Sequence, residues 1–270
     1  RQLYAGQYGV AFDYTEMPQH HVGKFGIKID EYVNHHNSHA AAGYFTSPFK
    51  EAVILTVDAI GEWDTVTICV AKNNKIQKIE TIRYPHSLGI LYSAFTQRCG
   101  LKPAEEEYIL MGMAAYGKDD YKDDIYEDFV QQTPFKLKQN IHRGIGKWHP
   151  DAYPIDLAAS VQSVLVECLA GLWHKASKYG SKNLVYVGGV ALNCVANGKI
   201  LNQKIFDNIW IQPAAGDAGG ALGAALAAYH IMLNKPRSPS AGRDRMRGSF
   251  LGPEFSREQI NEQLTKCGAV

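Results

Sequence analysis

Apolar runs rich in β-branched residues predict three strands after residue 50. The run "EAVILTVD" (51–58) is apolar, rich in β-branched residues and ends in an acid. "TVTICVAKNN" (65–74) and "KIQKIETIRYP" (75–85) continue the strand pattern, and the pair Asn73-Asn74 between them is typical of a hairpin turn. We therefore expect an antiparallel meander of three strands.

Segments with helical spacing follow and alternate with further strands. Helices are predicted at 87–100, 104–117 and 154–180, where a serine cap, acidic first turns or a closing glycine mark the ends. A buried strand is predicted at 183–189, and 208–233 is expected to hold a strand, a loop and a helix of small residues. This alternation indicates an α/β fold with a mixed sheet flanked by helices.

Two segments depart from the alternation. Residues 118–153 are acidic, then basic, and aromatic throughout, with no clear period, and we interpret them as an excursion or lid. Residues 235–255 are rich in Pro, Gly, Ser and Arg, which is typical of a linker. Ser256 and Gln259 form a capping box that predicts a further helix, so we expect a domain junction here.

Composition narrows the class of protein. The chain has 270 residues, of which 46% are hydrophobic and 20% charged, enough for one large domain or two small ones. A formal net charge of +1 gives no electrostatic argument for a nucleic-acid or membrane partner. Five scattered cysteines without a CxxC pair favour reduced thiols and a cytoplasmic location. We expect no apolar run long enough to cross a bilayer and no signal peptide.

The stretch "VNHHNSHAAAG" carries the first candidate chemistry. His35 and His39 are four residues apart, so on a helix both imidazoles share one face and can bind one ion, whereas His36 points elsewhere. Taken alone, the cluster is equally consistent with a chance grouping at a helix start capped by Asn34 or Ser38. The remaining ligands must come from other parts of the chain.

Three loops at predicted strand ends offer such groups. Asp58 can give a carboxylate to a metal, and Asp217 lies in a glycine-rich turn before a helix, where an anion or a metal-phosphate pair is favoured. Gly188 and Gly189 leave room for a ligand, and Asn193 can contact an adenine edge or cap the next helix. Each loop also has a purely structural reading as a tight turn or cap. Together they predict a ligand site, because ligands in α/β sheets gather at the carboxyl ends of strands.

The order of five motifs resembles a known family. The motifs are "NHHNSHAAAG", "VILTVDAIGEWDT", "EEEYILMGMAAYGK", "VYVGGVALN" and "AAGDAGGALGAAL". Between about residues 32 and 256 the chain resembles the O-carbamoyltransferase family of the nodulation-protein (NodU) and cephamycin type. This resemblance implies an actin-like ATPase (ribonuclease H-like) fold, incomplete at the N-terminus. A more distant similarity links the chain to the tRNA threonylcarbamoyltransferases, which share the Asn-His-x-x-x-His and Gly-Gly-Val-x-x-Asn elements.

The resemblance also implies roles for individual residues. The implied ligands of an iron or zinc ion are two imidazoles and two carboxylates, which suit such a divalent ion: His35, His39, Asp58 and Asp217. Contacts to the acyl-adenylate phosphate are implied for Gly61, Asp64 and Thr65, to adenosine for Gly188, Gly189 and Asn193, and to ribose for Glu107 and Gly117. Ile109 stands where many relatives have a lysine, so no role is carried over there. No catalytic base is assigned, and the candidates are His36, Asp64, His86 and Glu62.

The domain organisation implied by the resemblance has three parts. Residues 1–50 would be the remainder of a first actin-like subdomain, 51–234 a second subdomain with the nucleotide and metal site, and 235–270 a linker and the start of a missing C-terminal YrdC-like domain. On this basis we expect the isolated chain to be inactive.

The function implied is transfer of a carbamoyl group from carbamoyl adenylate, made from ATP, to a hydroxyl of a sugar, antibiotic or oligosaccharide. Fe(II) is the expected metal and zinc the alternative. Two other functions stay open: a tRNA threonylcarbamoyladenosine-type transferase, and a non-catalytic ATP-binding module of the actin or Hsp70 kind. The balanced charge and the linker argue against the first. The histidine pair argues against the second, since those ATPases use magnesium held by oxygen ligands.

Overall fold

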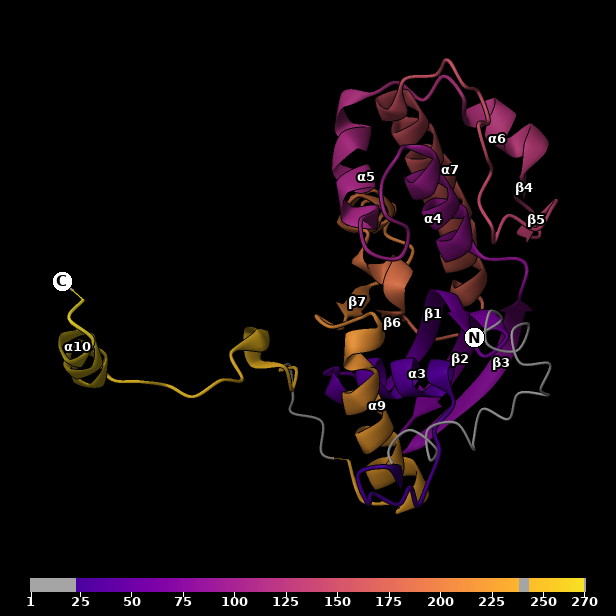
Figure 1. Ribbon diagram of the computed structural model, residues 1–270. Helices are drawn as coiled ribbons and strands as arrows, with labels where there is room; N and C mark the ends of the chain where they lie inside the picture. The colour runs from indigo at the N-terminus through magenta and orange to yellow at the C-terminus, as the bar shows by residue number, and fades with distance from the viewer. Residues whose placement is uncertain (1–22, 238–242, 270) are drawn as a thin grey trace.

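The predicted meander forms one side of a five-stranded sheet in the computed structural model, which describes residues 23–237 and 243–269 (Figure 1). The strands are β1 (Glu51–Gly61), β2 (Asp64–Lys72), β3 (Lys75–Arg83), β6 (Asn183–Val187) and β7 (Asn208–Ile211). They lie in the order β3-β2-β1-β6-β7. The meander strands pair antiparallel, whereas β1, β6 and β7 pair parallel. The prediction of a mixed sheet is confirmed, and the carboxyl ends of its three parallel strands meet at one edge.

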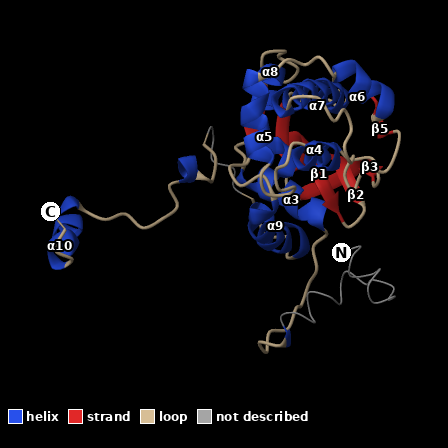
Figure 2. Ribbon diagram, turned by 45° about the horizontal axis from the view of Figure 1, so that its top comes forward, coloured by secondary structure: helices blue, strands red, loops and turns tan. Residues whose placement is uncertain are grey.

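Helices cover both faces of the sheet (Figure 2). Successive side chains of a strand point to opposite faces, so each central strand contributes buried residues to two helical layers. Val53 and Leu55 of β1 belong to one buried cluster, and Ala52 and Ile54 belong to the other. The first cluster is completed by α4 (Leu88–Arg98) and α7 (Pro154–Ser177), and the second by α3 (His35–Thr46) and α9 (Gly220–Ala227). The strands thus lie between two helical layers.

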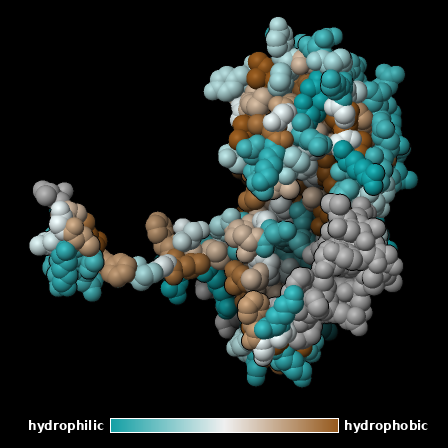
Figure 3. Space-filling view, viewed as in Figure 1, coloured by the Kyte–Doolittle hydropathy of each residue, from teal (hydrophilic) through white to brown (hydrophobic). Residues whose placement is uncertain are grey.

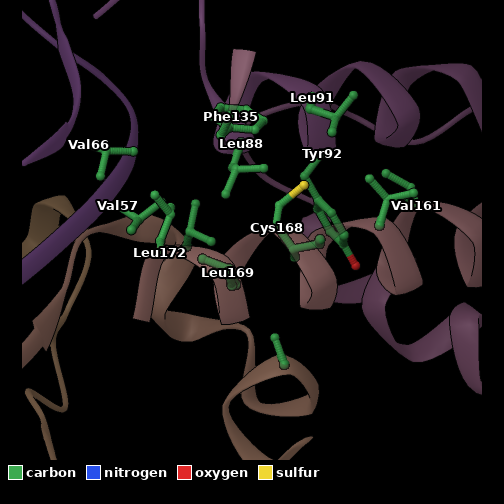
Figure 4. Packing of buried hydrophobic residues seen from close by; sticks show 14 of the residues in the cluster. Val57, Val66, Leu88, Leu91, Tyr92, Phe135, Val161, Cys168, Leu169 and Leu172 are labelled. Carbon is green, nitrogen blue, oxygen red and sulfur yellow. The ribbon is translucent and has the colours of Figure 1, made fainter. Parts of the chain in front are cut away.

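Helix α7 is the longest element and the centre of the larger cluster. Cys168, Leu169 and Leu172 lie beside Val57 of β1 and Leu88 of α4 (Figure 4). An 18-residue window of α7 has a mean hydropathy of 1.5, so by length and composition this helix is able to cross a membrane. The sequence expectation that no run is long enough was wrong on this point. The structure gives the apolar character another role, since 61% of that window is buried inside the protein.

Shorter helices and strands lie between these elements in the chain. They are α5 (Glu107–Met113), α6 (Lys122–Asp128), β4 (Val130–Gln131), β5 (Lys136–Leu137) and α8 (Cys194–Leu201). The sequence did not predict α6 or the β4–β5 hairpin, which fall inside the excursion at 118–153. This segment packs on α4: the rings of Trp148 and Phe95 lie 5.4 Å apart, and Arg98 donates to the carbonyl oxygens of Trp148 and His149 at 2.6 Å. The excursion is therefore part of the core layer beside α7.

The chain that follows α9 returns to the C-terminal end of α3. The Arg237 guanidinium donates to the carbonyl oxygens of Tyr44 and Ser47 at 2.6 and 2.9 Å and lies 4.1 Å from the centre of the Tyr44 ring. The Arg245 N–H donates to the carbonyl oxygen of Thr46 at 2.9 Å. These contacts satisfy carbonyl groups that a helix end leaves unpaired, so they hold the C-terminal end of α3 in place.

The last element, α10 (Arg257–Lys266), lies apart from the sheet and its helices (Figure 1). Its start confirms the predicted capping box: the Gln259 N–H donates to the Ser256 side chain, and the Ser256 N–H donates to the Gln259 side chain. The lower side of α10 is hydrophilic in Figure 3. Ile260 and Leu264, four residues apart on this helix, are exposed apolar side chains.

Candidate metal centre

Four side chains from three elements converge at the carboxyl edge of the parallel strands. His35 and His39 project from the first turns of α3, Asp58 from β1, and Asp217 from the short 3-10 helix η3 (Asp217–Gly219) that precedes α9. One ligand atom of each residue lies within 4.8 Å of the other three. The histidine Nε2 atoms are 3.0 Å apart, and the Nε2 atom of His35 lies 2.8 Å from Asp58 Oδ2 and 3.2 Å from Asp217 Oδ1. The structure therefore brings together the four residues that sequence reasoning singled out.

The chemistry and spacing of this cluster fit a divalent metal ion. Two imidazole nitrogens and two carboxylate oxygens are donors that such ions accept. Ligand atoms placed tetrahedrally about 2.1 Å from one ion lie about 3.4 Å from each other. The Nε2 atom of His39 lies 3.4 Å from both Asp58 Oδ2 and Asp217 Oδ1. The other separations that involve the histidines are 2.8 to 3.2 Å, so the four donor atoms of this His/Asp cluster lie close enough together to share one ion.

The four side chains of the cluster differ in exposure, and their hydrogen bonds with one another shift their pKa values. The His39 side chain is 1% exposed, whereas that of Asp217 is 77% exposed. Burial alone would lower the pKa of His35, but hydrogen bonds with Asp217 and Asp58 outweigh it and raise that pKa from 6.5 to about 9. Burial would raise the pKa of Asp58, but its hydrogen bonds with the two histidines hold it well below the usual range. The metal-free cluster is thus a network of histidine-carboxylate pairs.

His36 lies outside this cluster. Its side chain is buried, and its Nδ1 atom lies 3.2 Å from Thr67 Oγ1 on β2. Burial is the main cause that lowers the pKa of His36 to about 4. The residue therefore packs as a neutral side chain against the sheet. The sequence placed His36 on another face of the helix from His35 and His39 but did not predict this burial.

A cavity of about 440 Å³ adjoins the cluster on the side of Asp58 and Asp217. Among the predicted nucleotide residues, Gly189, Asn193 and Glu107 line it. Asp58 joins the cavity lining to the metal ligands, because its Oδ1 atom accepts a hydrogen bond at 3.1 Å from the N–H of Gly189, which lines the cavity. A ligand in this cavity would lie directly beside the candidate metal position.

Other predicted phosphate and ribose residues do not line this cavity. Asp64 pairs with Lys78 at 2.7 Å and Arg83 at 3.2 Å on β3, because the strand register places it opposite β3. The buried Thr65 hydroxyl donates to the carbonyl oxygens of Ile82 and His86. The other two are glycines: Gly61 lies against the ring of His35 and Gly117 against the backbone of Ile155.

The fold itself requires glycine at the two positions after β6, Gly188 and Gly189. Gly188 has φ +95°, a left-handed conformation that favours glycine, and an added Cβ would lie 2.2 Å from the Val57 carbonyl oxygen. A Cβ on Gly189 would lie 2.9 Å from Asp58 Oδ1. This pair therefore allows β1 and β6 to bring Asp58 close to the next loop.

Asn193 belongs to a buried amide network that the sequence did not reveal. Its side chain caps α8 by accepting from the Ala196 N–H at 2.9 Å, as one of the two sequence interpretations proposed. Gln162 of α7 exchanges two hydrogen bonds with Asn193, at 3.0 and 3.1 Å, and accepts from the Tyr92 hydroxyl at 2.8 Å. Gln162 lies among apolar residues of a long helix, so no local signal points to it.

The comparisons with known proteins identify the class. The chain belongs to the family described as "Carbamoyltransferase N-terminus", whose model matches residues 19–226. This result agrees with the resemblance seen in the five motifs.

Several curated proteins are similar to this chain. An uncharacterized protein of Synechocystis sp. is 42% identical over 254 residues, which cover 85% of this chain and 41% of that protein. Nodulation protein NolNO of Sinorhizobium fredii is 33% identical over 89% of this chain and 37% of its own length. Nodulation protein NolO of Bradyrhizobium diazoefficiens is 30% identical over 85% of this chain and 43% of its own length. The chain thus spans about two fifths of the length of the curated relatives it matches.

Among solved structures, the crystal structure of HypF from T. kodakarensis matches with a TM-score of 0.47 and 15% sequence identity. The match covers 80% of this chain and 38% of that one.

Proposed function

We propose that this chain is the metal-binding and transfer part of an O-carbamoyltransferase, which moves a carbamoyl group from carbamoyl adenylate to a substrate hydroxyl. The observation that carries the proposal is the position of the His/Asp cluster at the wall of a cavity of about 440 Å³ in a chain of this family. A cavity of this size is suited to a ligand as large as a nucleotide.

The chain's own residues divide the task. His35, His39, Asp58 and Asp217 would hold the ion, for which Fe(II) is the first choice and zinc the second. The ion would supply positive charge close to the phosphate of the AMP leaving group. Asp58 serves both parts of the site, since one oxygen faces the histidines and the other holds the Gly189 N–H.

The walls of the cavity support a role for it in binding the adenylate. Tyr92, Met111 and Leu165 provide apolar surface from α4, α5 and α7, and Asn193, which shares the partner Gln162 with Tyr92, also lines the cavity. Such surface excludes water from a reactive acyl phosphate and holds a base by contact with its face. The amide network around Asn193 keeps this wall rigid.

No side chain of the described residues is assigned as the base for the acceptor hydroxyl. Of the sequence candidates, His36 faces β2, and Asp64 is paired with two cations of β3. The acceptor class of sugar, antibiotic or oligosaccharide and a cytoplasmic setting remain parts of the proposal. So does the formation of carbamoyl adenylate by a YrdC-like domain of the same polypeptide.

Binding of 5′-O-sulfamoyladenosine, a stable mimic of an acyl adenylate, tests the proposal by calorimetry. Gly216 lines the cavity, and its added Cβ would make only ordinary contacts with Leu192 and Gly189, so Gly216→Val should add side-chain volume to the cavity. We expect affinity at least about tenfold lower in Gly216→Val than in the wild type. Gly198→Ala is the matched control, because nothing lies within 4 Å of its added Cβ.

Metal dependence separates transferase chemistry from simple nucleotide binding. Adding Co(II) or Fe(II) should strengthen binding of the mimic to the wild type and have no effect on His39→Ala, which lacks one ligand of the cluster. Equal affinities in the wild type and Gly216→Val, or a metal effect that survives in His39→Ala, would contradict the proposal.

A further inference from the structure

The first turn of α3 carries a metal-ligand candidate at its very start. The helix begins at His35, whose N–H has no partner within the helix. Asn34 occupies the N-cap position, but its side chain makes no capping hydrogen bond. The position of the His35 ring therefore depends on whatever group accepts this N–H.

That group is the carboxylate of Glu62, in the turn between β1 and β2. Its Oε1 and Oε2 atoms accept from the His35 N–H at 3.2 and 3.3 Å. The Tyr32 hydroxyl donates to Oε1 at 2.6 Å. A carboxylate at a helix N-terminus also interacts favourably with the helix dipole. Glu62 thus serves as the cap that Asn34 does not provide.

The same turn places other parts of the centre. Gly61 lies so close to His35 that an added Cβ would be 2.3 Å from the ring Cδ2 atom. Asp58 lies only four residues before Glu62, on β1. Glu62 itself has φ +48°, a conformation that a residue with a side chain adopts at a cost and that neighbouring contacts must hold. One short segment therefore supplies one ligand and holds another.

We propose that Glu62 is a positioning residue of the metal centre. Its carboxylate fixes the first turn of α3 against β1, so that the Nε2 atom of His35 faces Asp58 and Asp217. The inference rests on the proposed function only in assuming that the cluster binds a metal. It also gives Glu62 a role other than that of a general base, since both of its carboxylate oxygens are directed at the helix end.

Loss of Glu62 should loosen this turn without unfolding the helix. Arg237 holds the C-terminal end of α3, and Ala40 and Ala41 lie in the buried cluster between α3 and the sheet. The expected effect is a change in the position of His35, which metal affinity and a metal spectrum report directly.

The test is an anaerobic Co(II) titration of the chain, with visible absorption of the bound ion and a competing chelator. Removal of a group that orients a metal ligand lowers affinity by about 10- to 100-fold, so Glu62→Ala should raise the Kd for Co(II) by that factor and change the spectrum. Glu62→Gln keeps an acceptor oxygen at this position and should recover most of the affinity. Glu51→Ala is the control, because Glu51 lies at the far end of β1 and pairs with Lys72 at 3.0 Å.

The outcomes separate this inference from the proposed function. A wild-type chain that binds no Co(II) would refute the metal centre itself. A wild-type Kd and spectrum in Glu62→Ala, or a Glu62→Gln variant as weak as Glu62→Ala, would overturn the positioning role alone. Hydrogen exchange of the metal-free proteins gives a second readout: the first-turn amides of α3 should exchange faster in Glu62→Ala and at the wild-type rate in Glu51→Ala.

Discussion

Raising the pH from 6.5 to 9 should destabilise the metal-free protein. Hydrogen bonds with Asp217 and Asp58 outweigh the effect of burial and raise the pKa of His35 from 6.5 to about 9 in the folded protein. A group whose pKa is raised by folding contributes stability that is complete below the unfolded pKa and disappears as the pH passes the folded pKa. The loss is therefore expected between pH 6.5 and 9.

The size of this effect follows from the same pKa change. Each pKa unit corresponds to about 1.4 kcal/mol, so His35 accounts for at most about 3 kcal/mol of unfolding free energy. The His35 side chain is only 17% exposed, so solvent screening reduces this value little. A loss of this size is a large part of the 5 to 15 kcal/mol that is about the usual stability of a domain.

Urea unfolding at several pH values, with chelator present, measures this loss. In His35→Gln, the unfolding free energy should change little between pH 6.5 and 9. His174→Gln, a change at an exposed site near the end of α7, should show the same decrease of unfolding free energy with pH as the wild type. Bound Zn(II) or Co(II) should reverse the trend, because metal binding requires neutral imidazoles and improves as the pH rises. Metal-free stability that stays constant or increases from pH 6.5 to 9 would refute the reasoning.

Two further predictions concern the core and the cavity wall. Phe95→Ala should lower the unfolding free energy by about 3 to 5 kcal/mol in urea, because Phe95 is fully buried beside the rings of Phe129 and Trp148; a loss below about 1 kcal/mol would show that this packing is misjudged. Gln162→Leu should cost about 1 to 3 kcal/mol and weaken binding of the adenylate mimic, since it leaves the Asn193 amide without its buried partner. Wild-type stability and affinity in Gln162→Leu would contradict the role of the amide network.

Three strands of the sheet and the four candidate ligands could be predicted from the sequence, because each follows from local geometry. Runs of apolar and β-branched residues bounded by turn residues are typical of strands, and such runs located β1, β2 and β3. The four-residue spacing of His35 and His39 matches one helix face, and parallel strands end at one edge, which brought Asp58 and Asp217 into the same prediction.

Other features depend on contacts that the sequence does not display. The cap formed by Glu62 spans 27 residues to His35, and the Gln162–Asn193 pair spans 31 residues. The elements α6, β4 and β5 are too short to show a period. Asp64 was expected at the phosphate, but the pairing of β2 with β3 places it opposite Arg83, and this register is not evident from composition.

The most direct test of the central claim is the stoichiometry of Fe(II) binding under anaerobic conditions, measured by calorimetry on the wild type and on the double variant His35→Ala/His39→Ala. We predict one ion per chain in the wild type. Loss of both imidazoles removes half of the donor set, so the variant should bind at least about a hundredfold more weakly. Stoichiometric Fe(II) binding that is unchanged in the double variant would contradict the metal centre proposed for this member of the carbamoyltransferase N-terminus family.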